Sequence, residues 1–201
     1  MYVARILYPV KVLGPGLRIG IWFAGCKHHC HGCSNPELWE FNNHYRTSLE
    51  GVMRLISSIA QTKHVDGFTL TGGDPLEQPD DLLELIDNIS HISDDILLYT
   101  GYNFEEVKKN YPDILNRIAV LIDGKYVETE NYGEKLKGSK NQRIIVLDDT
   151  KVEKYKSYIQ SSDSDIQNFF IDNSTISVGI HKPGYEKELD QALERKGLIH
   201  G

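Results

Sequence analysis

One stretch of the sequence joins a strand-like segment to all three cysteines of the chain: Leu17-Arg-Ile-Gly-Ile-Trp-Phe-Ala-Gly-Cys26-Lys-His-His-Cys30-His-Gly-Cys33. The first part, Leu17–Ala24, is apolar at alternate positions and beyond, which predicts a buried strand. The cysteines follow directly in a C-x3-C-x2-C pattern. An odd number of cysteines excludes a fully paired disulfide framework, and thiolates this close together favour zinc, copper(I) or an iron–sulfur cluster. The stretch therefore predicts a metal-binding loop at the end of a buried strand.

The rest of the chain alternates strand-like and helix-like segments. Capping patterns at Thr47–Glu50 and Asn103–Glu106 predict two helix starts, and Pro79 suits the first turn of another helix. Further apolar strands are predicted at Gly67–Thr71, Ile96–Thr100, Ile118–Ile122 and Arg143–Leu147. Strands buried on both faces and separated by helices indicate a parallel α/β sheet. Functional residues should then gather at the C-terminal ends of the strands, where the cysteine loop, Gly72-Gly73 and Thr100–Tyr102 all fall.

Length and composition predict an α/β core with a small extension. The chain has 201 residues, of which 40% are hydrophobic and 25% are charged, as in ordinary globular proteins. We expect a core domain over residues 1–149. Residues 150–201 are expected to form a C-terminal extension of a helix, a short strand pair and a helix, packed on the core.

Charge and hydropathy exclude several function classes. The chain has 22 Lys+Arg against 29 Asp+Glu, a net charge of -7, and no basic run. The electrostatic signature of a nucleic-acid-binding protein is therefore missing. No apolar run is long enough to span a bilayer, and the N-terminus lacks the apolar core of a signal peptide. We expect a cytoplasmic protein that binds neither nucleic acid nor a membrane.

Several interpretations of the cysteine loop stay open at this point. A cubane cluster has four irons, so three thiolates leave one iron without a protein ligand, and an open metal position is typical of catalytic sites. One alternative is a structural zinc ion completed by His28, His29 or His31, although such sites usually have their second ligand pair a dozen or more residues away. Another is a set of core cysteines that bind no metal. Histidines in a polar loop are more often solvated or hydrogen-bonded than metal ligands.

Six motifs occur in order along the chain: Gly14–Arg18, Gly25–Asn35 with Trp39, Leu70–Leu76, Tyr99–Tyr102, Ile122–Tyr126 and Leu136–Arg143. Together they resemble the radical S-adenosylmethionine (radical SAM) superfamily and, within it, the activating enzymes of anaerobic (class III) ribonucleoside-triphosphate reductases. The resemblance covers about residues 5–147. It implies a partial, open (β/α) barrel of the radical SAM type.

The resemblance implies an oxidoreductase in which Cys26, Cys30 and Cys33 hold a [4Fe-4S] cluster. The open iron would bind the amino and carboxylate groups of S-adenosylmethionine. One electron from the reduced cluster would cleave the sulfonium to methionine and a 5'-deoxyadenosyl radical. That radical would remove a hydrogen from a glycine of the partner, an anaerobic ribonucleoside-triphosphate reductase. A low-potential donor such as flavodoxin or ferredoxin would supply the electron.

The same resemblance implies contacts to S-adenosylmethionine. Gly72 and Gly73 would let the backbone approach the cofactor, and Asp74 would meet its ammonium group. Taken alone, this segment is typical of an ordinary strand-to-helix turn. Members of the superfamily often have an aromatic residue before the third cysteine, where this chain has Gly32, and Ser34 replaces an aromatic residue common in the subgroup. Backbone groups of Gly32–Ser34 are therefore the predicted adenosine contacts.

Other polar and aromatic residues of the motifs have two interpretations each. Asp123, Lys137 and Arg143 could contact the partner or a ligand carboxylate, but an ion-paired structural role is at least equally expected. Trp22 and Trp39 are predicted to lie in the core or to shield the cluster.

Two other functions of the protein also stay open. One is a radical SAM enzyme acting on another glycyl-radical enzyme or on a small molecule, and the other is a non-catalytic iron–sulfur or zinc-binding module.

Overall fold

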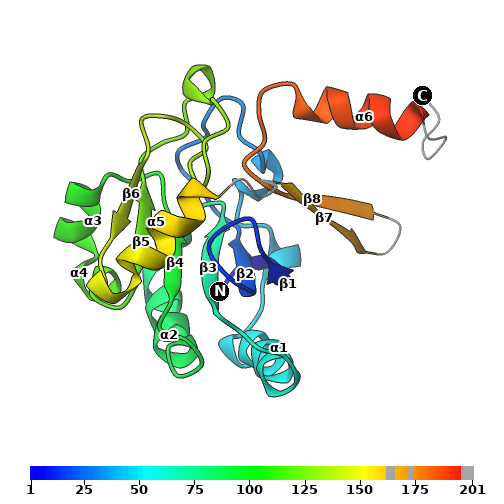
Figure 1. Cartoon of the computed structure of the whole chain (residues 1–201). Coiled ribbons are helices and arrows are strands. Elements are labelled where there is room, and N and C mark those ends of the chain that lie inside the picture. Colours follow the sequence, from blue (N-terminus) through cyan, green and yellow to red (C-terminus); the bar gives the residue numbers. More distant parts are fainter. Residues whose placement is uncertain (162–165, 172–173, 196–201) are drawn as a thin grey trace.

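The computed structural model describes residues 1–161, 166–171 and 174–195, and its main feature is a six-stranded sheet (Figure 1). The strands lie in chain order: β1 (Val3–Val10), β2 (Arg18–Phe23), β3 (Gly67–Gly72), β4 (Ile96–Tyr99), β5 (Val120–Asp123) and β6 (Arg143–Val146). β2 to β5 are parallel, whereas β1 is antiparallel to β2 and β6 is antiparallel to β5. The α/β prediction is therefore confirmed, with a mostly parallel sheet.

The two edge strands differ from the expectation of a wholly parallel sheet. No α-helix stands between β5 and β6, whose linking residues are all described, so the chain returns antiparallel without a crossover. β1 is not predicted from the sequence because most of its side chains are only half-buried and it contains Arg5 and Pro9. Such residues are tolerated in an edge strand. The partial barrel of the radical SAM type stays a prediction.

Helices follow the strands, and their starts have the local signals expected of them. The described α-helices are α1 (Leu49–Thr62), α2 (Pro79–Ile89), α3 (Phe104–Asn110), α4 (Pro112–Leu115), α5 (Val152–Gln160) and α6 (Tyr185–Arg195). α1 begins after Ser48, whose hydroxyl accepts a hydrogen bond from the amide of Gly51, so the cap lies one residue after the predicted Thr47. Asn103 and Glu106 form the predicted capping box at the start of α3.

The sheet is buried on both faces. All residues of β2 are buried, and α1 to α4 pack on one face of the sheet through a large apolar cluster. On the other face α5 crosses β4 and β5 (Figure 1), and its buried Tyr155 packs against Leu97 and Val120. No helix in the described part of the chain has the length and apolarity needed to cross a membrane.

A buried ionic cluster ties α5 to the N-terminal ends of the strands. Arg18 is fully buried at the start of β2, and its Nη1 lies 3.0 Å from Oδ1 of Asp95. The hydroxyl of Tyr155 donates to the same oxygen over 2.7 Å, and Lys154 pairs with the second oxygen. Removing one partner would leave a buried charge without compensation, so this cluster stabilises the docking of α5 on the sheet.

The end of the described chain is a hairpin followed by a helix. β7 (Ile166–Ile171) and β8 (Ser174–Gly179) pair antiparallel, and α6 follows them. Residues 162–165, 172–173 and 196–201, which belong to the predicted extension, lie outside the described residues. The division of the chain after residue 149 stays a prediction.

Candidate functional site

The cysteine loop follows β2 at the C-terminal edge of the sheet, and backbone hydrogen bonds hold its first residues in place. The amide of Gly25 donates to the carbonyl oxygen of Leu38 over 2.8 Å, and the amide of Cys26 donates to that of Trp39 over 2.8 Å. These bonds pair the start of the loop with residues that follow it in the chain. The position of the first cysteine is therefore set by the backbone.

Gly72 and Gly73 lie at the end of β3, beside the same part of the loop. The amide of Gly73 donates to the carbonyl oxygen of Phe23 over 2.7 Å. A Cβ on Gly73 would lie 2.5 Å from the carbonyl oxygen of Gly25, and one on Gly72 would lie 2.4 Å from that of Phe23. Gly72 also has a φ of 112°, which favours glycine. Glycine is thus needed here for contact with the protein's own backbone, whatever ligand lies beyond.

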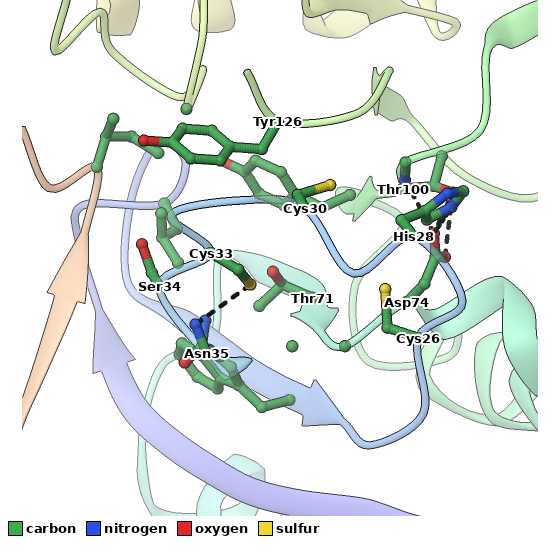
Figure 2. Close-up of a pocket in the computed structure, with 18 of the residues that line it drawn as sticks. Cys26, His28, Cys30, Cys33, Ser34, Asn35, Thr71, Asp74, Thr100 and Tyr126 are labelled. Carbon is green, nitrogen blue, oxygen red and sulfur yellow. Dashed lines mark hydrogen bonds and ion pairs between the residues drawn. The ribbon is translucent and has the colours of Figure 1, made fainter. Parts of the chain in front are cut away.

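The predicted site residues, except Gly32, line one cavity of about 200 Å³: Cys26, Cys30, Cys33, Ser34, Gly72, Gly73 and Asp74. Figure 2 shows the three cysteines around the same space, with Asp74 on the side of Cys26. Gly32 lies instead against Glu128, whose carboxylate would be 2.6 Å from a Cβ at this position. The structure therefore brings the ends of β2 and β3 together as a single site.

Backbone groups lie beside the three sulfur atoms. The amide of Asn35 donates to the sulfur of Cys33 over 3.4 Å. The backbone of Tyr126 beside Cys30, and that of His28 and His29 beside Cys26, lower the pKa of these two thiols and so oppose the effect of burial. Such donors stabilise thiolates and the anionic clusters that thiolates bind. Among the described residues, no three His, Cys, Asp or Glu side chains converge closely enough to hold one metal ion. Three soft sulfur ligands with amide donors around a shared cavity fit an iron–sulfur cluster.

The thiols themselves are in an unfavourable place for ionisation. Burial raises the pKa of the Cys26 thiol to about 11, and the charge of Asp74 adds to the rise. Burial also raises the pKa of Cys30. Because metals bind the thiolate, loading this site must release protons and must bring positive charge to compensate for them.

Asp74 holds a buried negative charge at the edge of the cavity. Its side chain is 1% exposed, and four donors surround its carboxylate. The hydroxyl of Thr100 lies 3.0 Å from Oδ1 and 2.9 Å from Oδ2. Oδ2 also accepts from the amide of Gly101 over 2.9 Å and lies 3.0 Å from Nε2 of His28, while Oδ1 accepts from the amide of Leu76 over 3.0 Å. The last bond caps the short helix Pro75–Glu77, so Asp74 has a structural role as well.

The three histidines of the loop have different surroundings. The His28 side chain is 8% exposed and points to the carboxylate described above. His29 stacks on Trp39 with ring centroids 4.7 Å apart, and His31 is 93% exposed and pairs with Glu128 over 2.8 Å. Nothing in the sequence distinguishes His28 from its neighbours, so its contact with the site is visible only in the structure.

Two buried polar atoms beside the cavity have no hydrogen-bond partner among the described residues. They are the hydroxyl of Tyr99 and Nε1 of Trp39, and both side chains line the cavity. Burial raises the pKa of Tyr99 well above its ordinary value, so its hydroxyl stays protonated and can donate. A buried polar group without a partner costs about 1–3 kcal/mol. A ligand that satisfied these atoms would therefore be stabilised in the cavity.

The remaining motif residues make structural contacts. The buried carboxylate of Asp123 pairs with Arg143 and accepts a 2.6 Å hydrogen bond from the amide of Phe104 at the start of α3. Lys137 pairs with Glu134 over 2.6 Å. Trp22 is 4% exposed and packs in an apolar cluster on the second face of the sheet. These positions agree with the structural interpretations of these residues.

Comparison with known proteins identifies the family. The family model described as a 4Fe-4S single cluster domain matches residues 12–145. Proteins named anaerobic ribonucleoside-triphosphate reductase-activating protein are similar to this chain. The one from Enterobacteria phage T4 is 36% identical over 144 residues, which cover 69% of this chain and 90% of the relative. The one from Vibrio cholerae is 32% identical over 145 residues, which cover 68% and 93%, and the one from Escherichia coli K12 is 33% identical over 127 residues, which cover 60% and 82%. The resemblance in the motifs is thus confirmed, and the chain belongs to the 4Fe-4S single cluster domain family, among the anaerobic ribonucleoside-triphosphate reductase-activating proteins.

Proposed function

We propose that the protein generates a glycyl radical on an anaerobic ribonucleoside-triphosphate reductase, with S-adenosylmethionine as the source of the radical. The observation that carries this proposal is that three cysteine thiols and the buried carboxylate of Asp74 line the same cavity. The names of the relatives supply the protein substrate. When bound, a [4Fe-4S] cluster with one open iron would supply the electron that cleaves S-adenosylmethionine to methionine and a 5'-deoxyadenosyl radical.

In this proposal Asp74 binds the ammonium group of S-adenosylmethionine. An ionised carboxylate in a buried site makes stronger hydrogen bonds than a neutral acceptor, and it repels the carboxylate end of the ligand. Thr100 and Gly101 hold both oxygens of Asp74 in one orientation. The negative charge therefore fixes which end of the ligand lies next to Cys26.

The neighbouring backbone would hold the rest of the cofactor. Gly72 and Gly73 line the cavity at the end of β3, and backbone groups of Cys33 and Ser34, which line it too, would contact the adenosine. Gly32, the third residue predicted for this contact, lies outside the cavity lining. The sheet, with its four parallel central strands, is proposed to be the partial, open barrel of the radical SAM type. Such an open barrel leaves one side of the site for a large protein substrate.

The reaction needs positioning more than it needs acid–base chemistry. The 5'-deoxyadenosyl radical takes one hydrogen atom from the α-carbon of the glycine, which leaves 5'-deoxyadenosine and a glycyl radical. Because such a radical attacks almost any nearby carbon, its target must be held in place and water must be kept out. The reductase segment that carries the glycine would do both. We place the reaction in the cytoplasm, with a flavodoxin or ferredoxin as the low-potential electron donor.

Electron paramagnetic resonance tests this function directly. Anaerobically reconstituted protein is reduced and mixed with S-adenosylmethionine and the reductase, and the Cys30→Ala variant serves as the control. We expect one stable glycyl radical on the reductase and an equivalent amount of 5'-deoxyadenosine with the unaltered protein, and neither with the variant. Cleavage without a signal on the reductase, but with rapid turnover of another protein or a small molecule, would overturn the proposed substrate. Isolation of a zinc protein without cleavage activity would overturn the radical chemistry.

A further inference from the structure

The β7–β8 hairpin lies outside the part of the chain that the family shares. The family model ends at residue 145, and the match to the phage relative covers 90% of that relative but 69% of this chain. The hairpin begins at Ile166, well beyond the matched region. Any contact that it makes with the site is therefore made by residues outside the region that the family model matches.

The hairpin is docked firmly on the core by two kinds of contact. Val178 of β8 is 3% exposed and packs in the apolar cluster that contains Val10 and Trp22. Gln167 of β7 donates from Nε2 to the carbonyl oxygen of Pro9 over 2.7 Å and accepts from the amide of Lys11 over 2.9 Å. Apolar burial and the two hydrogen bonds of the Gln167 side chain thus fix both strands next to the end of β1.

This docking brings the end of β8 to the cavity that holds the cysteines. The residues from Ser177 to His181 line the cavity. Nδ2 of Asn131 lies 2.7 Å from the carbonyl oxygen of His181 and 3.1 Å from the hydroxyl of Tyr126. Tyr126 lines the same cavity as Cys30. A short chain of contacts therefore joins the hairpin to the cysteine loop.

The hairpin side of the cavity differs in chemistry from the Asp74 side. Figure 2 shows the end of the hairpin beside Tyr126, away from Asp74 and Thr100. The hairpin contributes a hydroxyl, an imidazole, two aliphatic side chains and the backbone of Gly179, and Tyr126 adds an aromatic ring. Polar groups without a carboxylate, combined with flat and apolar surfaces, suit a nucleoside, whereas the ammonium group at the amino-acid end of a ligand suits the carboxylate of Asp74.

We propose that the β7–β8 hairpin is a wall of the binding cavity that contacts the nucleoside end of S-adenosylmethionine and closes that side of the site to solvent. The identity of the ligand rests on the proposed function, whereas the existence of the wall does not. The shared domain would then supply the cluster and the ammonium site, and this chain's own extension would supply part of the specificity for the adenosine.

Three variants of the full chain test the role of the hairpin without changing the cysteine loop or Asp74. Val178→Asp places a charge in the apolar contact and should release the hairpin. Gln167→Ala removes the hydrogen bonds to Pro9 and Lys11 and leaves the core untouched, so it remains informative if Val178→Asp does not fold. Phe170→Ser is the matched control, because Phe170 is on the same hairpin, is 81% exposed and does not line the cavity. Circular dichroism verifies that each variant is folded.

The first measurement does not depend on any ligand. The rate at which a bulky maleimide modifies the three thiols of the reduced, metal-free chain reports access to the cavity. We expect it to rise in Val178→Asp and, to a smaller extent, in Gln167→Ala, and to stay unchanged in Phe170→Ser. If the thiols of both test variants react at the same rate as those of the unaltered protein, the hairpin does not form a wall of the cavity.

The second measurement is equilibrium binding of labelled S-adenosylmethionine to the reconstituted protein. We expect Kd to rise about tenfold when the hairpin is released, with unchanged iron content. Faster thiol modification with an unchanged Kd would refute the contact between the hairpin and the nucleoside. It would still support the hairpin as a wall of the cavity. Absence of binding in the unaltered protein would instead refute the proposed function, and the maleimide rates would still decide the existence of the wall.

Discussion

Replacing Asp74 by Asn removes a buried negative charge and keeps the size of the side chain. The new side chain can still accept hydrogen bonds from Thr100 and Leu76, but its amide group faces the N–H of Gly101 where Oδ2 now accepts over 2.9 Å. Leaving a buried N–H without an acceptor costs about 1–3 kcal/mol. For a chain of this length each kcal/mol lowers Tm by about 2–4 °C, so we expect Tm to fall by about 2–12 °C.

The effect of this substitution on ligand binding should be larger than its effect on stability. Truncating one partner of a buried, hydrogen-bonded charge pair costs about 2–5 kcal/mol, which corresponds to a Kd for S-adenosylmethionine raised about 30- to 5,000-fold. Equilibrium dialysis of the labelled ligand against reconstituted protein measures this change, with iron content determined on the same samples. Thr100→Val is the matched control, since it keeps the charge and removes one neutral donor to it.

The two readouts separate a binding role from a purely structural one. Asp74→Asn with a lower Tm and an unchanged Kd would show that Asp74 only caps the turn after β3, and the assignment of the ammonium site would be refuted. A Kd raised equally in Thr100→Val and Asp74→Asn would show that the orientation of the group matters and its charge does not.

Metal content, the glycine contact and acid stability provide three more predictions. Anaerobic reconstitution should load about four irons per chain, and changing any ligand cysteine to Ala should remove most of them; one tightly held zinc per chain would contradict this. Gly73→Val should lose both iron and thermal stability, because its Cβ would lie 2.5 Å from the carbonyl oxygen of Gly25 and 2.7 Å from that of Leu38; a stable variant with full iron content and weaker ligand binding would show that the ligand makes the critical contact. Burial raises the pKa of Asp95, but the charge of Arg18 and the hydrogen bonds from Lys154 and Tyr155 together lower it by more than burial raises it. The pKa of Asp95 in the folded protein therefore lies below its ordinary value. A carboxyl group whose pKa is depressed in the folded protein stabilises the fold at pH values above its unfolded-state pKa of about 3.9. This stabilisation is lost as the pH falls through the folded-state pKa. Urea titrations should therefore show the free energy of unfolding dropping below about pH 4, with a shallower drop in Asp95→Asn; equal pH dependence in the two proteins would contradict this.

Local patterns in the sequence were sufficient for the central strands and for the edge of the sheet that carries the site. The apolar run Leu17–Ala24 contains β2 (Arg18–Phe23), since a strand buried on both faces leaves a continuous apolar signal. β1 leaves no such signal, because most of its side chains are only half-buried and it has a neighbouring strand on one side alone. The antiparallel direction of β6 goes with the absence of a crossover α-helix, because residues 124–142 contain only the short 3-10 helix Glu128–Glu130.

The site shows the same division between local and long-range information. The spacing of the cysteines and the position of Asp74 after a strand are local features, and they are sufficient to predict one shared site. The contact between His28 and Asp74 joins residues 46 positions apart. Gln78 is a similar case, because its side chain donates to the carbonyl oxygens of Ala24 and Tyr2, and nothing in its neighbours indicates this. Such contacts depend on how distant segments are placed by the sheet.

The cysteine loop is attached to the rest of the protein by backbone atoms, through the amides of Gly25, Cys26, Gly73 and Asp74, and none of these bonds uses a sulfur atom. A zinc finger folds only when it binds its metal, whereas here backbone hydrogen bonds to the sheet hold the start of the ligand loop in place. The entropy of placing Cys26 is therefore lost when the chain folds, before any iron is bound. We therefore expect that a chain whose cluster has been lost to oxygen can be reloaded with iron, sulfide and a reductant without being unfolded and refolded.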